Sequence, residues 1–233
     1  VGVANALLKH TVSHSLSGGR VVWAVDSHGE TWRKQIDKSY KATRPPMENN
    51  LREQLEAINE IAEAFGAVKF GVPRQDADDV IATLVERHAE EGVMILAEDK
   101  DLYQLVGPNV RIIRKKGVVD VDGVISTYGI PPRLVPDFLA MTGDAADNIP
   151  GIKGIGPKNA AKLLEKLETL EAVLERGPTE ADTKNIRNKL SAVNADDVLQ
   201  YRRLTRLDRE CELPSAYYPE EPPAIDWVRL LHL

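Results

Sequence analysis

Acidic residues stand at the points where predicted strands end, and such a pattern is typical of a metal site. One aspartate ends a strand, three follow the next strand at the start of a helix, and two follow the third strand. Ligands of open α/β sheets bind beyond the carboxyl ends of the strands, so we expect these side chains at one rim. Because clustered carboxylates repel one another, the rim is expected to bind hard divalent cations, Mg²⁺ or Mn²⁺. The predicted ligands are Asp26, Asp76, Asp78, Asp79, Asp99 and Asp101.

Each of these aspartates also has a structural interpretation. Asp76 or Asp78 would suit the N-cap of the helix that follows them. Asp99 would suit the cap of the short helix "DLYQL", and Asp26 would suit a turn. Both interpretations stay open for any single residue, whereas the gathering of six carboxylates at one rim favours metal binding.

Asp144 and Asp147 add two further carboxylates, spaced so that one turn of chain can aim both at a common point. Two divalent ions held by such groups suit the in-line hydrolysis of a phosphodiester, because one ion helps to generate the hydroxide and the other stabilises the leaving oxygen. No Ser–His–Asp or Cys–His arrangement competes with this chemistry, since the five histidines are scattered along the sequence. The sequence contains no set of residues typical of a zinc site.

Two periodicities alternate along the chain and predict an α/β fold. Short β-branched runs indicate buried strands, and apolar residues at helical spacing over 51–65 and 80–85 indicate helices between them. This alternation predicts a mainly parallel sheet flanked by helices, with a short antiparallel piece at 118–123. From about Ile125 the pattern becomes helical, up to a proline-rich tail. The strand runs are residues 20–26, 67–72, 92–98 and 109–114.

The composition limits the class of protein. Of 233 residues, 42% are hydrophobic and 28% charged, which suits one compact soluble domain with a smaller subdomain. No run is apolar and long enough for a bilayer and no secretion signal is visible, so we expect no membrane partner. Cys211 is the single cysteine, which excludes an internal disulfide and favours a reducing, cytoplasmic setting. The net charge of −6 argues against nucleic acid, unless metal ions reverse the local field.

The stretch "GIKGIG", residues 151–156, is called the glycine hairpin below. It differs from a dinucleotide fingerprint because no strand precedes it and it lies among helices. Two helices joined by such a hairpin are better interpreted as a nucleic-acid clamp, in which backbone amides and a helix N-terminus meet phosphates. The nearest lysines, Lys153 and Lys158, are the better phosphate candidates, whereas Lys162 and Lys166 are interpreted as solvated surface.

Four stretches carry a family resemblance. "DADDVIATL", "AEDKDLYQLV", "SYKATRPPM" and "TGDAADNIPGIKGIGPKNAAKLL" resemble the 5′-nuclease (flap endonuclease) family, closest to the nuclease domain of bacterial DNA polymerase I and its phage relatives. The match runs from about Gly2 to Pro214. It implies a PIN-like core, a divalent-metal 5′→3′ exonuclease and flap endonuclease activity, and branched DNA with a 5′ single-stranded end or flap as the substrate.

The resemblance also implies further ligands and partners. The glycine hairpin would be the family's helix–hairpin–helix DNA-binding element, with bound K⁺. The protein is expected to be a monomer, with a DNA polymerase as a partner. DNA-binding residues are then expected at Gly151, Lys153, Gly154, Gly156 and Lys158. We expect a nuclease core at 1–125, a helical DNA-binding region at 126–214 with its hairpin element at about 143–167, and a tail at 215–233.

Residues 27–47, called the arch segment below, match the family's helical arch, which receives a single 5′ strand. The segment is basic, and its aromatic residues could stack on bases, although a solvated basic loop is the alternative. The resemblance implies that Lys41 and Arg44 steady the scissile phosphate as catalytic residues. It implies that Arg33 and Tyr40 contact the strand.

Three features depart from the family pattern. The family's chain begins with a strand ending in Asp-Gly that supplies another carboxylate, whereas this sequence begins after it; we expect that the true N-terminus precedes "VGVANALLKH". Asp76 stands where the family has Glu, and Ala146 stands where Ser is common.

An alternative function is a non-catalytic, structure-sensing DNA-binding protein that lacks the first carboxylate. The retention of every other acid argues against it, because mutually repelling carboxylates serve no purpose without metal. A ribonuclease with a similar acidic core is a third possibility, but such proteins lack the glycine hairpin.

Overall fold

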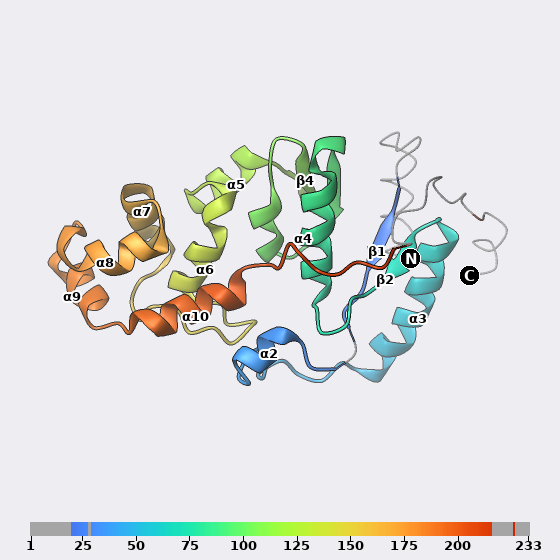
Figure 1. The fold of residues 1–233 in the computed structure, drawn as a ribbon, viewed down its shortest axis with the longest axis horizontal. Coiled ribbons are helices and arrows are strands. Elements are labelled where there is room, and N and C mark those ends of the chain that lie inside the picture. The colour runs from blue at the N-terminus through green and yellow to red at the C-terminus, as the bar shows by residue number, and fades with distance from the viewer. Residues whose placement is uncertain (1–19, 28, 216–225, 227–233) are drawn as a thin grey trace. The chain divides into compact units, whose positions relative to one another are not determined.

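The fold is described from a computed structural model, which describes residues 20–27, 29–215 and 226 (Figure 1). The chain forms two compact units. The first comprises Val1–Thr31, Pro45–Val80 and Cys211–Leu233, and the second comprises Trp32–Arg44 and Ile81–Glu210. The N-terminal segment "VGVANALLKH" and most of the proline-rich tail lie outside the described residues.

The first unit contains a two-stranded parallel sheet, β1 (Val22–Ala24) and β2 (Val68–Phe70), with Val22 paired to Val68. The chain reaches β2 through α3 (Asn49–Ala64), the helix that the apolar spacing predicted. Ala62 in its last turn and the C-cap residue Phe65 pack in a small core that β1 joins through Trp23. The Trp23 indole also donates to the Asn59 side chain at 3.0 Å, which anchors β1 to α3.

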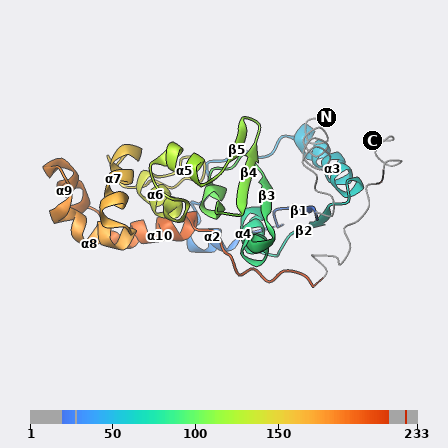
Figure 2. The ribbon, with the colours of Figure 1, turned by 90° about the horizontal axis from the view of Figure 1, so that it is seen from above.

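The second unit holds a three-stranded sheet in the order β3–β4–β5 (Figure 2). β3 (Val93–Leu96) and β4 (Val110–Arg114) are parallel, and β5 (Gly117–Val119) returns antiparallel to β4. The predicted α/β class and the parallel pairing are therefore confirmed, although the parallel pairs lie in two short sheets. The antiparallel piece expected at 118–123 is present only in part, because the strand ends at Val119 and a helix begins at Val121. The strands are shorter than the β-branched runs that predicted them.

Helices make up most of the second unit, as the change of pattern near Ile125 predicted. Among the described residues, no helix is long and apolar enough to cross a membrane. The helices and helical turns are α2 (Trp32–Ile36), α4 (Ala77–His88, which begins in the first unit), η1 (Ala89–Glu91), η2 (Asp101–Leu105), α5 (Val121–Tyr128), η3 (Pro132–Leu134), α6 (Val135–Thr142), α7 (Pro157–Leu167), α8 (Leu170–Glu180), α9 (Lys184–Ser191) and α10 (Ala195–Thr205).

Helix α6 forms the centre of the second unit. Every residue from Val135 to Met141 is buried, and the helix packs against α7 and α10. Apart from Asp137, whose carboxylate accepts the Leu170 amide at 3.0 Å, these residues are apolar, and a helix that is apolar on nearly all sides is stable only inside a core. Its position matters for function, because the chain leaves α6 directly into Gly143 and Asp144. A rigid, buried helix therefore fixes the start of the acidic turn.

Candidate metal centre and its surroundings

The first carboxylate group belongs to the first unit and surrounds the start of α4. Asp26, which follows β1, accepts a hydrogen bond from the Ala77 amide at 2.9 Å. Asp79 is fully buried, and its carboxylate accepts from the Asp76 amide at 3.2 Å. This hydrogen bond from the third helical residue back to the residue before the helix is one of the two that make up a capping box. The group is completed by Asp78, which is half-buried in the first turn, where the helix dipole favours negative charge.

The second carboxylate group belongs to the second unit. Asp99 and Asp101 follow β3, and Asp144 and Asp147 follow α6. Asp101, Asp144 and Asp147 each offer one oxygen, and these oxygens all lie within 4.8 Å of one another. Asp99 is exposed, and it accepts a hydrogen bond from the Asp101 amide at 2.9 Å, which shapes the turn between them.

Residues 144–149, called the acid loop below, form a turn that aims two carboxylates the same way. The Asp144 and Ile149 backbones exchange two hydrogen bonds of 2.8 Å, and the Asp144 carboxylate accepts from the Ala146 amide at 3.0 Å. Gly143 starts the turn at φ +79°, and a Cβ there would lie 2.7 Å from the Ile149 carbonyl oxygen. Only glycine fits this position, so the glycine before the acids is part of what aligns them.

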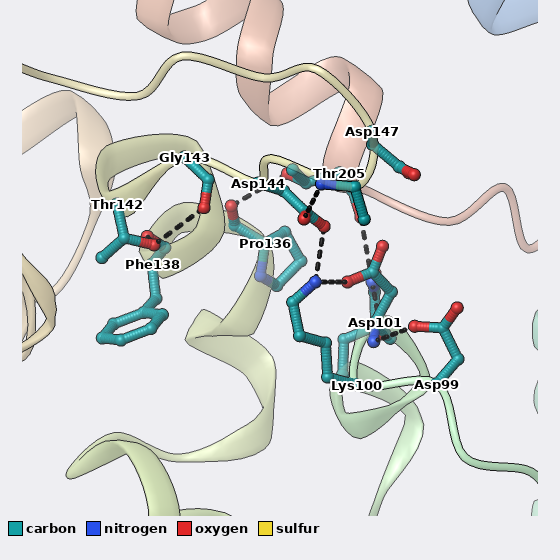
Figure 3. Close-up of polar contacts among 12 residues, drawn as sticks. Asp99, Lys100, Asp101, Pro136, Phe138, Thr142, Gly143, Asp144, Asp147 and Thr205 are labelled. Atoms are coloured by element: carbon teal, nitrogen blue, oxygen red, sulfur yellow. Dashed lines mark hydrogen bonds and ion pairs between the residues drawn. The ribbon is translucent and has the colours of Figure 1, made fainter. Parts of the chain in front are cut away.

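Lys100, which was not among the predicted site residues, reaches the same cluster. Its Nζ lies 2.5 Å from Asp144 Oδ2 and 3.7 Å from Asp101 Oδ1 (Figure 3). Burial lowers the pKa of Lys100, but the hydrogen bond to Asp144 and the charges of the neighbouring carboxylates outweigh it, so the pKa is raised overall. Its position between two predicted ligands, in the stretch "DKD", was the feature of the sequence that could have indicated this contact.

Asp101 has the environment of a metal ligand. Its burial, and then the charge of Asp99, raise its pKa to about 7, while Lys100 acts in the opposite direction. Its Oδ1 is buried and accepts no hydrogen bond from any described residue. A buried, under-coordinated carboxylate oxygen beside two further carboxylates fits a hard divalent cation. Asp101, Asp144 and Asp147 are therefore the described residues that best fit a metal ion.

Residues 39–44 of the arch segment are held against the acid loop. The Tyr40 hydroxyl donates to Asp147 Oδ2 at 2.9 Å, and Arg44 Nη2 donates to Asp147 Oδ1 at 2.5 Å. The Lys41 amide donates to the Asp147 carbonyl, and the Asn148 side chain donates to the Ser39 carbonyl. The Lys41 ammonium lies 4.9 Å from the centre of the Tyr40 ring. Both expected catalytic residues thus adjoin a predicted metal ligand.

The structure corrects the expectation that Arg33 contacts DNA. Only 1% of its surface is exposed, and its guanidinium donates to the carbonyls of Leu204 and Arg206 at 2.8 and 3.0 Å. These bonds hold the end of α10, since the last carbonyls of a helix lack partners of their own. Tyr40 is also buried, at 4% exposure, so its ring cannot stack on a base in this conformation.

The glycine hairpin joins α6 to α7, and its glycines serve different purposes. Gly151 and Gly154 have φ of +69° and +81°. A Cβ at 151 would lie 2.3 Å from the Gly143 amide nitrogen, so Gly151 is needed for the packing of the chain on itself. Gly154 is exposed, and Gly156 is open and precedes α7.

Lysines surround the hairpin tip. Lys153 and Lys158 are exposed, and among the described residues neither takes part in an ion pair. Lys189 on α9, which the sequence analysis missed, donates to the Gly154 carbonyl at 2.8 Å. Its 35-residue separation from Gly154 explains why local sequence patterns gave no signal for it.

Both parts of the chain match models of known protein families. A family model described as "5′-3′ exonuclease, N-terminal resolvase-like domain" matches residues 1–129, and "5′-3′ exonuclease, C-terminal SAM fold" matches residues 130–221. The 5′-3′ exonuclease of Aquifex aeolicus is 39% identical over 159 residues, which is 66% of this chain and 55% of that protein. The thermostable DNA polymerase I of Thermus thermophilus is 34% identical over 215 residues, covering 91% of this chain and 25% of that protein.

Solved structures share the fold. A phage T5 5′-exonuclease structure with bound divalent metal ions (zinc) has a TM-score of 0.71 at 18% identity and covers 88% of this chain and 81% of that chain. The catalytic core of Rad2 in complex with DNA substrate has a TM-score of 0.55 at 18% identity and covers 87% and 68%. The chain thus spans a quarter of the polymerase relative and about half of the exonuclease relative.

Proposed function

The chain belongs to the 5′-3′ exonuclease family, and we propose on this basis that it is a metal-dependent 5′ nuclease acting on DNA. It would hydrolyse phosphodiester bonds near the junction of single strand and duplex, as a 5′→3′ exonuclease and flap endonuclease. The observation that carries the proposal is the cluster of Asp101, Asp144 and Asp147, whose oxygens lie within 4.8 Å of one another.

The carboxylates would hold Mg²⁺ or Mn²⁺, which supplies Lewis-acid stabilisation of charge at the phosphate and an activated water. Asp101 offers a buried oxygen without a hydrogen bond, and the acid loop offers Asp144 and Asp147. The first carboxylate group is also proposed to bind metal, with Asp79 the weakest candidate because its carboxylate caps α4. The inclusion of all eight aspartates in one site stays a prediction, tested by the positions of Mn²⁺ in a soaked crystal.

Lys41 and Arg44 are proposed to act on the scissile phosphate. Arg44 is half exposed, at 49% of its side chain, and its guanidinium is held by Asp147 and by the Ala146 carbonyl. A phosphate near Asp147 would attract the same guanidinium, which could donate to both because its donors form a fork. Both residues would then stabilise negative charge that develops on the phosphate.

The hairpin is proposed to grip the duplex backbone, independently of base sequence. Lys153 and Lys158 offer exposed positive charge, and α7 begins at the open Gly156 with its positive dipole end. Contacts of this kind fix the position of DNA without reading its sequence. K⁺ bound to hairpin carbonyls is part of the same proposal.

The partners and setting are proposed on the same grounds. The substrate would be branched DNA with a 5′ single-stranded end or flap, and a DNA polymerase is the proposed partner because several relatives are named DNA polymerase I. We further propose a cytoplasmic monomer with a nuclease core at 1–125, a DNA-binding region at 126–214 and a tail at 215–233.

The decisive experiment incubates the chain with a labelled 5′-flap duplex, with and without Mg²⁺. We expect cleavage near the junction only when Mg²⁺ is present, and no cleavage by Asp101→Asn. Lys116→Met is a matched control, because Lys116 is exposed on the β4–β5 turn and outside the proposed site. Tight, structure-dependent DNA binding without cleavage under any divalent ion would instead support the non-catalytic DNA-binding protein.

A further inference from the structure

Lys100 places a positive charge inside the second carboxylate group. Its ammonium lies between Asp144 Oδ2, at 2.5 Å, and Asp101 Oδ1, at 3.7 Å (Figure 3). The acids are largely enclosed, with 7% and 14% of their side chains exposed, whereas 39% of the Lys100 side chain is exposed. The lysine thus reaches from the surface into the cluster.

The contact uses an oxygen that a metal ion would need. Asp144 Oδ1 accepts the Ala146 amide, and Oδ2 accepts the Lys100 ammonium, so both oxygens of Asp144 have partners. A divalent ion binds carboxylate oxygens at about 2.0–2.1 Å for Mg²⁺. An ammonium and a divalent ion on the same oxygen would then repel each other at close range. Metal binding through Oδ2 therefore requires Lys100 to leave.

We propose that Lys100 is a built-in counter-cation that competes with the divalent metal ion for Asp144. The ammonium stabilises the metal-free fold by offsetting repulsion among the acids, and it lowers the affinity of the site for metal. The inference rests on the proposed metal centre and adds a residue that sets its affinity. Lys100 and Arg44 belong to different segments. Arg44 is part of the arch segment, whereas Lys100 stands between Asp99 and Asp101, so a displacement of the arch segment would not remove Lys100 from the acids.

The experiment measures Mn²⁺ binding by the full chain without DNA, by electron paramagnetic resonance of free Mn²⁺. Lys100→Met keeps the apolar stem and removes the charge, and we expect it to bind Mn²⁺ roughly tenfold more tightly. In chelator, its melting temperature should fall by about 2–4 °C, and saturating Mn²⁺ should restore it. Lys100→Arg keeps the cation and should bind Mn²⁺ as weakly as the wild type does.

Two comparisons make the test specific. Lys116→Met removes the same charge from an exposed turn and should leave Mn²⁺ affinity unchanged. In an Asp144→Asn background, Lys100→Met should change Mn²⁺ affinity much less, because the oxygen in competition has lost its charge. If Lys100→Met fails to fold in chelator, Lys100→Gln, whose shorter side chain remains polar, takes its place in the same titrations.

The outcomes separate this inference from the proposed function. Unchanged or weaker Mn²⁺ binding by Lys100→Met, while the wild type binds normally, would overturn the role of Lys100 and leave the metal centre intact. An equal gain in affinity in the Asp144→Asn background would also overturn it, since competition for Asp144 would not be the cause. No Mn²⁺ binding by the wild type, with Asp101→Asn as reference, would overturn the metal centre and this inference together.

Discussion

The acid loop and the glycine hairpin are neighbouring parts of one connection between α6 and α7, but their charged side chains have different surroundings. In the acid loop, the carboxylates of Asp144 and Asp147 are bound by Lys100, Tyr40 and Arg44. At the hairpin, Lys153 and Lys158 are exposed and form no ion pair with the described residues. The acids of the first region thus contact internal cations, whereas the lysines of the second region are exposed to solvent.

This difference indicates what each region is built to bind. A carboxylate cluster that already attracts internal cations suits a divalent cation, because a higher charge at shorter range can replace them. Exposed lysines beside an open helix N-terminus suit an anion such as a phosphate. The proposed DNA substrate would offer phosphates to both regions, but the acid loop could accept one only when metal neutralises its charge.

Asp147→Asn should break the function of the acid loop without affecting the hairpin. The amide retains the shape of the side chain but loses the charge that would bind metal, so we expect cleavage to fall by roughly a hundred- to a thousandfold. DNA affinity should stay the same or improve, since repulsion of phosphate is lost as well. Single-turnover cleavage and a binding titration in Ca²⁺ measure the two effects. Wild-type cleavage by this variant would contradict the assignment.

Comparing Gly151→Ala with Gly156→Ala should distinguish a glycine that the backbone geometry requires from a glycine at which a side chain could be accommodated. At 151, φ is +69° and a Cβ would collide with the Gly143 amide, so we expect a loss of about 2–4 kcal/mol of unfolding free energy. At 156, φ is −88° and a Cβ would meet nothing within 4 Å, so stability should hardly change. Urea unfolding of both variants is the measurement. Equal losses would mean that the two positions are not distinct.

Arg44→Met should test whether the guanidinium that contacts Asp147 also acts on the phosphate. We expect the cleavage step to slow about tenfold or more, with little change in duplex affinity, because the charge would act on the phosphate during reaction. Tyr40→Phe is the control, since it removes the other side-chain partner of Asp147 and leaves the arginine in place. A loss of affinity alone, with an unchanged single-turnover rate, would make Arg44 an ordinary phosphate anchor.

The sequence predicted the features that depend on local pattern. The helix over 51–65, the parallel strand pairs and the helical second half follow from hydrophobic spacing, and the structure has all three. The tight turn that aims Asp144 and Asp147 together also follows from local spacing, and Gly143 supplies its backbone geometry. In each of these cases the signal lies in the residue spacing within short segments and in the order of those segments along the chain.

The features that sequence missed depend on long-range contacts. The family resemblance implied that Arg33 contacts the DNA strand, but its guanidinium donates to the Leu204 carbonyl, 171 residues away. Lys189 reaches the hairpin across 35 residues, and Lys100 reaches Asp144 across 44. A charged side chain looks the same in sequence whether it faces solvent or a buried acceptor, so such roles need the three-dimensional contacts.

Lys158→Ala should give the smallest effect and sharpen the contrast between the two regions. If this lysine meets a phosphate, its loss should weaken duplex binding and reduce the slope of log affinity against log salt by about one released counterion. Binding of a short single strand should change little, because that substrate needs only the arch segment and the metal centre. Lys166→Ala is the control, since Lys166 lies on the same helix but pairs with Asp182. Titrations of flap duplex and single strand across several salt concentrations measure the slopes. Equal losses for both substrates, or the same slope change in Lys166→Ala, would mean that the charge at the hairpin is only a solvated surface.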